Sequence, residues 1–216
     1  MNGVARFDLA KQILTHDEKR EIATQLLAGA LIIYPTDTLY AIGCLAFNPA
    51  ALERLRAAKG REGDKPLPVI AADLLQARAL TSSWPAAAQK LADVFWPGPL
   101  TLILPAAPDL PPQLLAGSTG VAVRVPASGP ARLLAGLAGP LVSTSANLAG
   151  QAPCTTVEAA VATFPSVDLI FDVGLLDGAP STIVEIEGPT TARWKLIREG
   201  AIAREKIEVE FGTLSP

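Results

Sequence analysis

The sequence predicts an α/β domain in which helices flank a twisted, mixed and mostly apolar sheet. Half of the 216 residues are hydrophobic and only 18% are charged, which is enough for a sizeable core and unlike a disordered chain. Strand and helix patterns alternate up to about residue 165, and most strand patterns are apolar on both faces. No repeat or linker divides the chain, so residues 1–216 are expected to form a single domain.

Helix patterns begin at residues that cap helices well. Thr15 to Glu18 has the form of a capping box, and Asn48 precedes a proline that suits a first helical turn. Glycines end both patterns, Gly29 the first and Gly60 the second. We expect helices at 16–28, 49–59, 85–96, 128–139 and 156–164.

Strand patterns are short apolar runs bounded by turn residues. We expect strands at 30–34, 67–72, 100–105, 120–126, 141–144, 168–173, 181–186 and 193–199. The last three follow one another without long helices between them. Part of the sheet is therefore expected to be antiparallel.

Composition excludes several kinds of site. His16 is the only histidine and lies at a predicted helix start, so no Ser-His-Asp triad, Cys-His pair or HExxH metal site can form. Cys44 and Cys154 are far apart and are expected to be buried apolar residues. The net charge of −3 gives no sign of nucleic-acid binding. Without a signal segment or a long apolar run, we expect a soluble, cytoplasmic protein that does not cross a membrane.

Cations and hydroxyls gather at the ends of the predicted strands, where α/β sheets bind ligands. The set comprises Thr36, Asp37, Thr38, Lys59, Arg61, Lys65, Arg124, Ser143, Ser145, Asn147, Ser181, Thr182, Lys195 and Arg198. Such groups suit a phosphate or carboxylate ligand, with the rate supplied by electrostatics and positioning. There is no Walker A loop and no G-x-G-x-x-G, so the residues alone predict a small anionic ligand bound in another way.

Each part of this set also has a purely structural interpretation. Arg124, between two valines, reaches either a buried anion or a structural ion-pair partner. The cations of 59–65 either bind phosphate or pair with Glu62 and Asp64 in a solvated loop. Ser145 could cap a turn and Asn147 could tighten it, with or without a ligand.

Seven motifs follow one another over residues 34–200. They are YPTDTLYAIG at 34–43, K-x-R followed by KP at 59–66, WPGPLT at 96–101, VAVRVP at 121–126, STSANLAG at 143–150, PST at 180–182 and IREG at 197–200. The ordered set closely resembles the YrdC/TsaC family of threonylcarbamoyl-AMP synthases. The resemblance implies an enzyme that condenses L-threonine, bicarbonate or CO2, and ATP, releasing pyrophosphate. It also implies a twisted α/β sheet with an open, concave, basic cavity.

Matching positions carry the family's roles to this chain. The resemblance assigns L-threonine to Thr38, Arg124, Ser143 and Ser181. It assigns ATP to Arg61, Lys65, Ser145, Asn147 and Arg198, and catalytic roles to Lys59 and Arg61. It implies Mg2+ carried by ATP rather than a metal site of the protein. The partners it implies are downstream proteins that transfer the threonylcarbamoyl group to tRNA, and it allows weak binding of tRNA itself.

The chain also departs from the family pattern. Ala41 follows Tyr40 where glycine is common, Glu62 follows the K-x-R motif where proline is common, and Ile70 stands near the place of a histidine. Ala41 is shared with the paralogue YciO, whereas STSAN favours a synthase. The alternatives are a YciO-like protein, an RNA-binding module, carbamoyl-adenylate chemistry as in hydrogenase maturation proteins, and a structural domain. Compared with longer relatives, the chain resembles the short, single-domain form.

Overall fold

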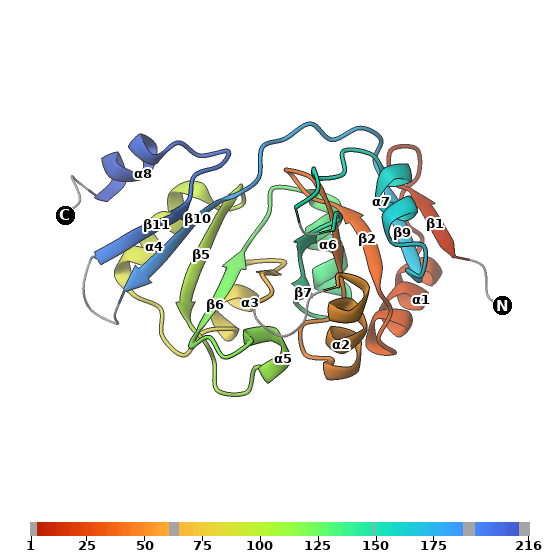
Figure 1. Cartoon of the computed structure of the whole chain (residues 1–216), viewed down its shortest axis with the longest axis horizontal. Helices are drawn as coiled ribbons and strands as arrows, with labels where there is room; N and C mark the ends of the chain where they lie inside the picture. Colours follow the sequence, from red (N-terminus) through yellow and green to blue (C-terminus); the bar gives the residue numbers. More distant parts are fainter. Residues whose placement is uncertain (1–3, 61–64, 149, 188–192, 212–216) are drawn as a thin grey trace.

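The computed structural model describes residues 4–60, 65–148, 150–187 and 193–211. Two mixed sheets lie next to each other with helices packed around them (Figure 1). The strands are β1 (Ala5–Asp8), β2 (Ile32–Pro35), β3 (Tyr40–Gly43), β4 (Val69–Ile70), β5 (Leu100–Pro105), β6 (Gly120–Arg124), β7 (Leu141–Val142), β8 (Thr144–Ser145), β9 (Leu169–Asp172), β10 (Thr182–Glu187) and β11 (Arg193–Arg198). The α/β class is confirmed, but the strands form two sheets where the sequence predicted one.

The helices are α1 (His16–Leu27), α2 (Pro49–Ala58), α3 (Leu74–Ala79), α4 (Ala86–Phe95), α5 (Pro112–Leu115), α6 (Gly129–Ala138), α7 (Val157–Thr163) and α8 (Arg204–Phe211). All five predicted helices are present. The capping box is confirmed, because the Glu18 amide donates to the Thr15 hydroxyl at 3.2 Å and the Thr15 amide donates to the Glu18 carboxylate at 2.7 Å. His16 is exposed at the first position of α1, as expected.

The strand order is β1-β9-β2-β3-β8 in the first sheet and β11-β10-β5-β6-β4-β7 in the second. Parallel and antiparallel neighbours occur in both sheets, which confirms the mixed character. The run at 67–72 forms only a two-residue strand, β4. The predicted strand at 141–144 is divided, since β7 pairs with β4 in the second sheet and β8 pairs with β3 in the first. The prediction missed β1 and β3.

Two clusters of buried side chains hold the elements together. One joins both sheets and includes Ile42, Val69 and Val123. The other packs the far face of the first sheet against α1 and α6 and includes Ile22 and Leu134. Each sheet therefore packs apolar side chains against helices, which explains why the sequence patterns of its strands are apolar on both faces. Cys44 and Cys154 are buried and free, as expected.

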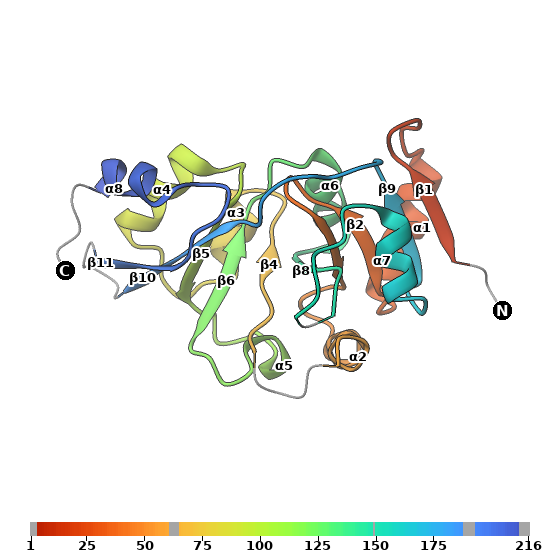
Figure 2. The ribbon, with the colours of Figure 1, turned by 45° about the horizontal axis from the view of Figure 1, so that its top comes forward.

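The molecule is elongated, with β1 at one end and α8 at the other (Figure 1). In the view of Figure 2, α2 and α5 lie at the same side of the molecule, and the two helices contact each other. Because α2 follows a strand of the first sheet and α5 follows a strand of the second, this contact joins the two halves. Within the described ranges, no helix has the length and apolar character needed to cross a membrane.

Candidate active site at the junction of the two sheets

The register of the second sheet brings four polar side chains together where neighbouring strands begin or end, which we call the site edge. They are those of Thr101, Arg124, Ser181 and Arg198. Leu102 lies opposite Val123, so Arg124 at the end of β6 meets the start of β5. Strand β10 runs parallel to β5, with Thr182 beside Leu100, so residue 181 lies at the same edge. Strand β11 runs antiparallel to β10 and ends there at Arg198. Residues from four distant motifs are thus neighbours because of strand pairing alone.

Arg198 and Ser181 form the outer part of this edge. The Arg198 guanidinium donates to the Ser181 carbonyl at 2.9 Å from Nη2 and 3.2 Å from Nε, and to the Ser181 hydroxyl at 3.3 Å. The Ser181 hydroxyl also shares a hydrogen bond of 3.0 Å with the hydroxyl of Thr101. Burial lowers the pKa of Arg198, and the charge of Arg124 lowers it further. Two guanidinium groups therefore act on each other at this edge.

Arg124 forms the inner part and pairs with a residue from the other sheet. Its Nη1 lies 3.1 Å from Oδ1 of Asp37, and the Arg124 side chain is only 7% exposed. Burial lowers the pKa of Arg124, whereas the Asp37 charge opposes that shift. The second oxygen of Asp37 is buried and has no partner among the described residues. The structural ion pair that the sequence left open is present, and it sits beside a second cation rather than in a neutral core.

The turn after β2 presents Thr38 next to this pair. Thr36 builds the turn, because its hydroxyl donates to the Leu39 carbonyl at 2.7 Å and accepts the Leu39 amide at 3.1 Å. The hydroxyls of Thr36 and Thr38 are 2.9 Å apart. A Cβ on Gly178 would lie 2.6 Å from the Thr38 carbonyl oxygen, so only glycine allows the 178 loop to cover the turn. Thr36 is thus structural, and Thr38 is the hydroxyl held in place.

The segment 141–145 crosses from one sheet to the other and carries two hydroxyls on one face. Ser143 lies at the crossing point, where its amide donates to the Pro68 carbonyl at 2.8 Å. Side chains alternate along extended backbone, so Ser143 and Ser145 share a face. Val142 and Thr144, on the other face, are buried, whereas Ser143 and Ser145 are partly exposed. The hydroxyls that follow a buried strand in the sequence are explained by this crossing.

Tyr34 lies near both Ser143 and Arg124. The fully buried phenol donates to the Val142 carbonyl at 2.9 Å. Burial raises the pKa of Tyr34 strongly, while the Ser143 hydroxyl and the Arg124 charge act in the opposite direction. Ser143 and Arg124 are therefore both near the same phenol.

Lys59 is the C-cap residue of α2, and its side chain is directed at the backbone of the S-A-N segment. The side chain is 2% exposed, and its ammonium donates to the Ser145 carbonyl at 2.7 Å and the Asn147 carbonyl at 2.6 Å. It also lies 5.5 Å from the Phe164 ring centroid. Lys59 therefore holds the backbone of the S-A-N segment. A direct catalytic contact of this ammonium stays a prediction.

The other predicted nucleotide contacts differ in how the structure places them. Arg61, with Glu62 and Asp64, lies outside the described residues. Lys65 is exposed. The Asn147 amide group donates to the Leu148 and Gln151 carbonyls, which confirms that this residue tightens a turn. Its side-chain oxygen is buried and has no partner among the described residues. A contact of Asn147 with a nucleotide stays a prediction.

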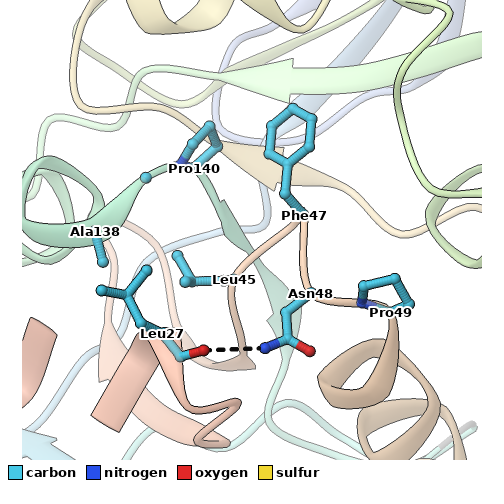
Figure 3. Close-up of a pocket in the computed structure, with 8 residues that line it drawn as sticks. Leu27, Leu45, Phe47, Asn48, Pro49, Ala138 and Pro140 are labelled. Carbon is cyan, nitrogen blue, oxygen red and sulfur yellow. Dashed lines mark hydrogen bonds between the residues drawn. The ribbon is translucent and has the colours of Figure 1, made fainter. Parts of the chain in front are cut away.

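Neither of the two described cavities coincides with the predicted residues. The larger, of about 410 Å3, is a mostly apolar hollow between the end of α1 and the start of α2, lined by residues such as Leu27, Phe47 and Pro140 (Figure 3). The second, of about 290 Å3, includes Trp96 and Arg132. We assign the site by its chemistry, because the buried Arg124, the more exposed Arg198 and the strand-end hydroxyls converge at the sheet junction and not in these hollows. The expected open basic cavity stays a prediction.

The site offers cations and hydroxyls rather than metal ligands. Among the residues that the structure describes, no three His, Cys, Asp or Glu side chains gather in a way that could hold a metal ion. Fixed guanidinium groups bind carboxylates and phosphates through charge-assisted hydrogen bonds. The arrangement can hold an amino-acid carboxylate and a polyphosphate side by side and orient them.

Sequence reasoning missed two residues that build the site. Asp37 was noted at a strand end but was not connected to Arg124, although both occupy a motif. Tyr34 read as the end of an apolar run. Ile70, near the expected histidine, is buried in β4 opposite Arg124 and offers no polar group.

Comparison with known proteins identifies the chain's relatives. The family model Sua5_yciO_yrdC, described as "Telomere recombination", matches residues 24–200. A threonylcarbamoyl-AMP synthase of Bacillus subtilis is 36% identical over 217 residues, which is 96% of this chain and 60% of that protein. The synthase of Chromobacterium violaceum is 39% identical over 171 residues, covering 78% of this chain and 89% of that one.

Two solved structures share the fold. Pyrococcus abyssi Sua5 in complex with L-threonine is 31% identical with a TM-score of 0.88, and the match covers 98% of this chain and 61% of that chain. Escherichia coli YciO is 25% identical with a TM-score of 0.79, covering 91% and 96%. The chain thus spans about three fifths of the B. subtilis and P. abyssi proteins. With a family match over most of its length and this shared architecture, the chain belongs to the Sua5/YciO/YrdC family.

Proposed function

We propose that this protein is an L-threonylcarbamoyladenylate synthase. It condenses L-threonine, bicarbonate or CO2, and ATP, and the product serves the formation of threonylcarbamoyladenosine in tRNA. The observation that carries the proposal is the convergence of Arg124, Arg198 and Ser181 at the ends of neighbouring strands, near Thr38 in the turn after β2 and Ser143 at the crossing between the sheets. Relatives named threonylcarbamoyl-AMP synthase, and the L-threonine complex of P. abyssi Sua5, support it.

In this proposal Arg124 binds the carboxylate of L-threonine. Its guanidinium is held by Asp37, so its orientation is set before the substrate arrives. The hydroxyls of Thr38, Ser143 and Ser181 complete the threonine pocket. Hydroxyl partners can discriminate threonine from valine, which has a methyl group in place of the hydroxyl, because a buried polar group left unpaired costs free energy.

ATP occupies the adjacent region, contacted by Arg61, Lys65, Ser145, Asn147 and Arg198. The threonine amine attacks CO2, forming an N–C bond and releasing a proton to solvent. A carbamate oxygen then attacks the α-phosphorus, and the bond to the β-phosphate oxygen breaks, so that pyrophosphate leaves. Lys59, Arg61 and Lys65 offset the charge that builds on the phosphates. Mg2+ would enter with ATP and would help to neutralise the phosphates, which suits a site built of cations and hydroxyls.

The product then passes to proteins that transfer the threonylcarbamoyl group to tRNA. We place this reaction in the cytoplasm, where ATP, threonine and tRNA are available together. Contact with tRNA itself is weak in this proposal, because the chain carries a net charge of −3.

The decisive experiment incubates the purified chain with ATP, bicarbonate and L-threonine and omits each in turn. Mass spectrometry of the adenylate and release of pyrophosphate are both measured. We expect product only when all three are present. Turnover with carbamoyl phosphate in place of threonine would favour the chemistry of hydrogenase maturation proteins. No adenylate with any combination, together with unimpaired ATP binding, would contradict the proposal and favour a YciO-like protein.

A further inference from the structure

Arg56 is a buried cation to which neither the proposed reaction nor the predicted site assigns a role. It lies on α2, one helical turn before Lys59, and is 6% exposed. Its Nε and Nη2 donate to the Gln113 carbonyl on α5, and Nη2 also donates to the Lys65 carbonyl at 3.2 Å. Its Nη1 is buried without a partner among the described residues.

The groups that Arg56 joins come from three separate parts of the chain. Helix α2 belongs to the half of the molecule with the first sheet, and α5 to the half with the second (Figure 2). Lys65 leads into β4, and the next hydrogen bond along, from the Leu67 amide to the Leu114 carbonyl at 2.9 Å, again connects this segment to α5. Arg56 therefore fixes the position of the Lys65 backbone relative to both halves of the molecule.

A buried charge is a costly way to obtain stability alone. Taking a charged group out of water costs free energy that good hydrogen bonds must recover, and a guanidinium offers a rigid fork that binds two carbonyls at defined angles. Lys59 uses the same strategy on the same helix, since its ammonium binds the carbonyls of Ser145 and Asn147. The C-terminal end of α2 thus places one cation against each of two backbone segments. Both segments carry predicted ATP contacts.

We propose that Arg56 is a positioning residue for ATP, which holds the Lys65 backbone so that the Lys65 ammonium reaches the phosphates. This inference rests on the proposed function. Arg56 itself does not touch the substrate in this account, and its effect on ATP passes through Lys65. Arg124 and Ser181 lie at the opposite end of the second sheet's strands from Lys65. Threonine binding there does not depend on Arg56.

The test compares Arg56→Met, Arg56→Lys, Lys65→Met and the double variant Arg56→Met/Lys65→Met. The matched control is Arg54→Met on the same helix, where the guanidinium is half-exposed and pairs with Asp168. Kinetic parameters for ATP and threonine are measured separately, together with ATP affinity by calorimetry and the Tm. We expect Arg56→Met to raise the KM for ATP and the Kd for ATP about tenfold, the loss of one charge-assisted contact. The KM for threonine should stay within about twofold.

The double variant distinguishes positioning from a general structural role. In the Lys65→Met background, Arg56→Met should have no further effect on ATP affinity, because Arg56 acts on ATP through the Lys65 ammonium, which is already absent. Arg56→Lys should lie between wild type and Arg56→Met, and Arg54→Met should leave ATP and threonine parameters unchanged. Equal losses for ATP and threonine, additive effects in the double variant, or unchanged ATP affinity in Arg56→Met would each overturn the inference. If Arg56→Met does not fold, Arg56→Lys alone and in the Lys65→Met background decides.

Failure of the proposed function would look different. A wild-type protein that binds ATP but makes no adenylate contradicts the synthase proposal. The calorimetric comparison of Arg56 and Lys65 variants still tests the positioning role in that case.

Discussion

At the scale of single residues, Arg124 combines a structural and a proposed catalytic-site role. It pairs with Asp37 across the two sheets and is itself buried, so its guanidinium is fixed in one orientation. We expect Arg124→Lys to raise the KM for threonine about tenfold to a hundredfold, because an ammonium keeps the charge but loses the planar fork. The KM for ATP should change much less. Steady-state kinetics with each substrate varied in turn measures this, and an unchanged threonine KM would contradict the assigned role.

Gly178 acts by having no side chain. A Cβ added at this residue would lie 2.6 Å from the Thr38 carbonyl oxygen and 2.9 Å from the Thr38 Cα. Gly178→Ala must therefore displace the turn that carries Thr38, and we expect kcat/KM for threonine to fall about tenfold or more. Gly136→Ala is the control, because Gly136 lies in the last turn of α6 and an added Cβ would be 3.8 Å from the Ala72 Cβ, an ordinary contact. That variant should be more stable by about 0.5–1 kcal/mol and fully active.

At the scale of elements, helix α2 positions two buried cations, Arg56 within the helix and Lys59 at its C-cap. Its N-cap Asn48 accepts the Ala51 amide at 3.0 Å and donates to the Leu27 carbonyl at the end of α1 at 3.3 Å (Figure 3). We expect Asn48→Ala to lower the free energy of unfolding by about 1–2 kcal/mol, through loss of the cap. Asn48→Asp, which retains the acceptor, should recover most of it. Urea unfolding measures both, and equal stability of Asn48→Ala and wild type would contradict the cap's role.

Helix ends and strand pairs were predictable to different degrees. The helices carry local signals, such as the capping box at Thr15 and Asn48-Pro49, and all five predicted helices are present within one or two residues. The segment 141–144 also read correctly as extended, yet its division between two sheets depends on β3 and β4, which no local pattern reveals. Strand pairing is non-local, and that is why the second sheet was missed.

At the scale of the whole molecule, a buried thiol makes stability depend on pH. Burial raises the pKa of Cys44 from 9.0 to about 12. In the unfolded chain the thiol loses its proton near pH 9, while the folded protein keeps it. The unfolded state therefore binds fewer protons above pH 9, and the free energy of unfolding falls as pH rises from about 9 to about 12.

The expected slope from this one group is about 1.4 kcal/mol per pH unit. Tyr34, whose pKa is also raised by burial, adds to the loss only above about pH 10, where a phenol in the unfolded chain ionises. Urea unfolding between pH 8 and 11 measures the dependence. Cys44→Ala should flatten it between pH 9 and 10, and an identical slope in that variant would contradict the assignment.

The sequence by itself determined the α/β class, the positions of the main helices and strands, the presence of a single histidine at a predicted helix start and the ordered motifs that indicate the family. Those features depend on local periodicity, composition and residue identity. Only the tertiary structure decided that Asp37 pairs with Arg124, that Ser143 stands at a crossing between sheets, and that the Lys59 ammonium binds backbone carbonyls. Each of these contacts joins residues far apart in the chain, and their partners follow from strand register and packing, which no single segment specifies.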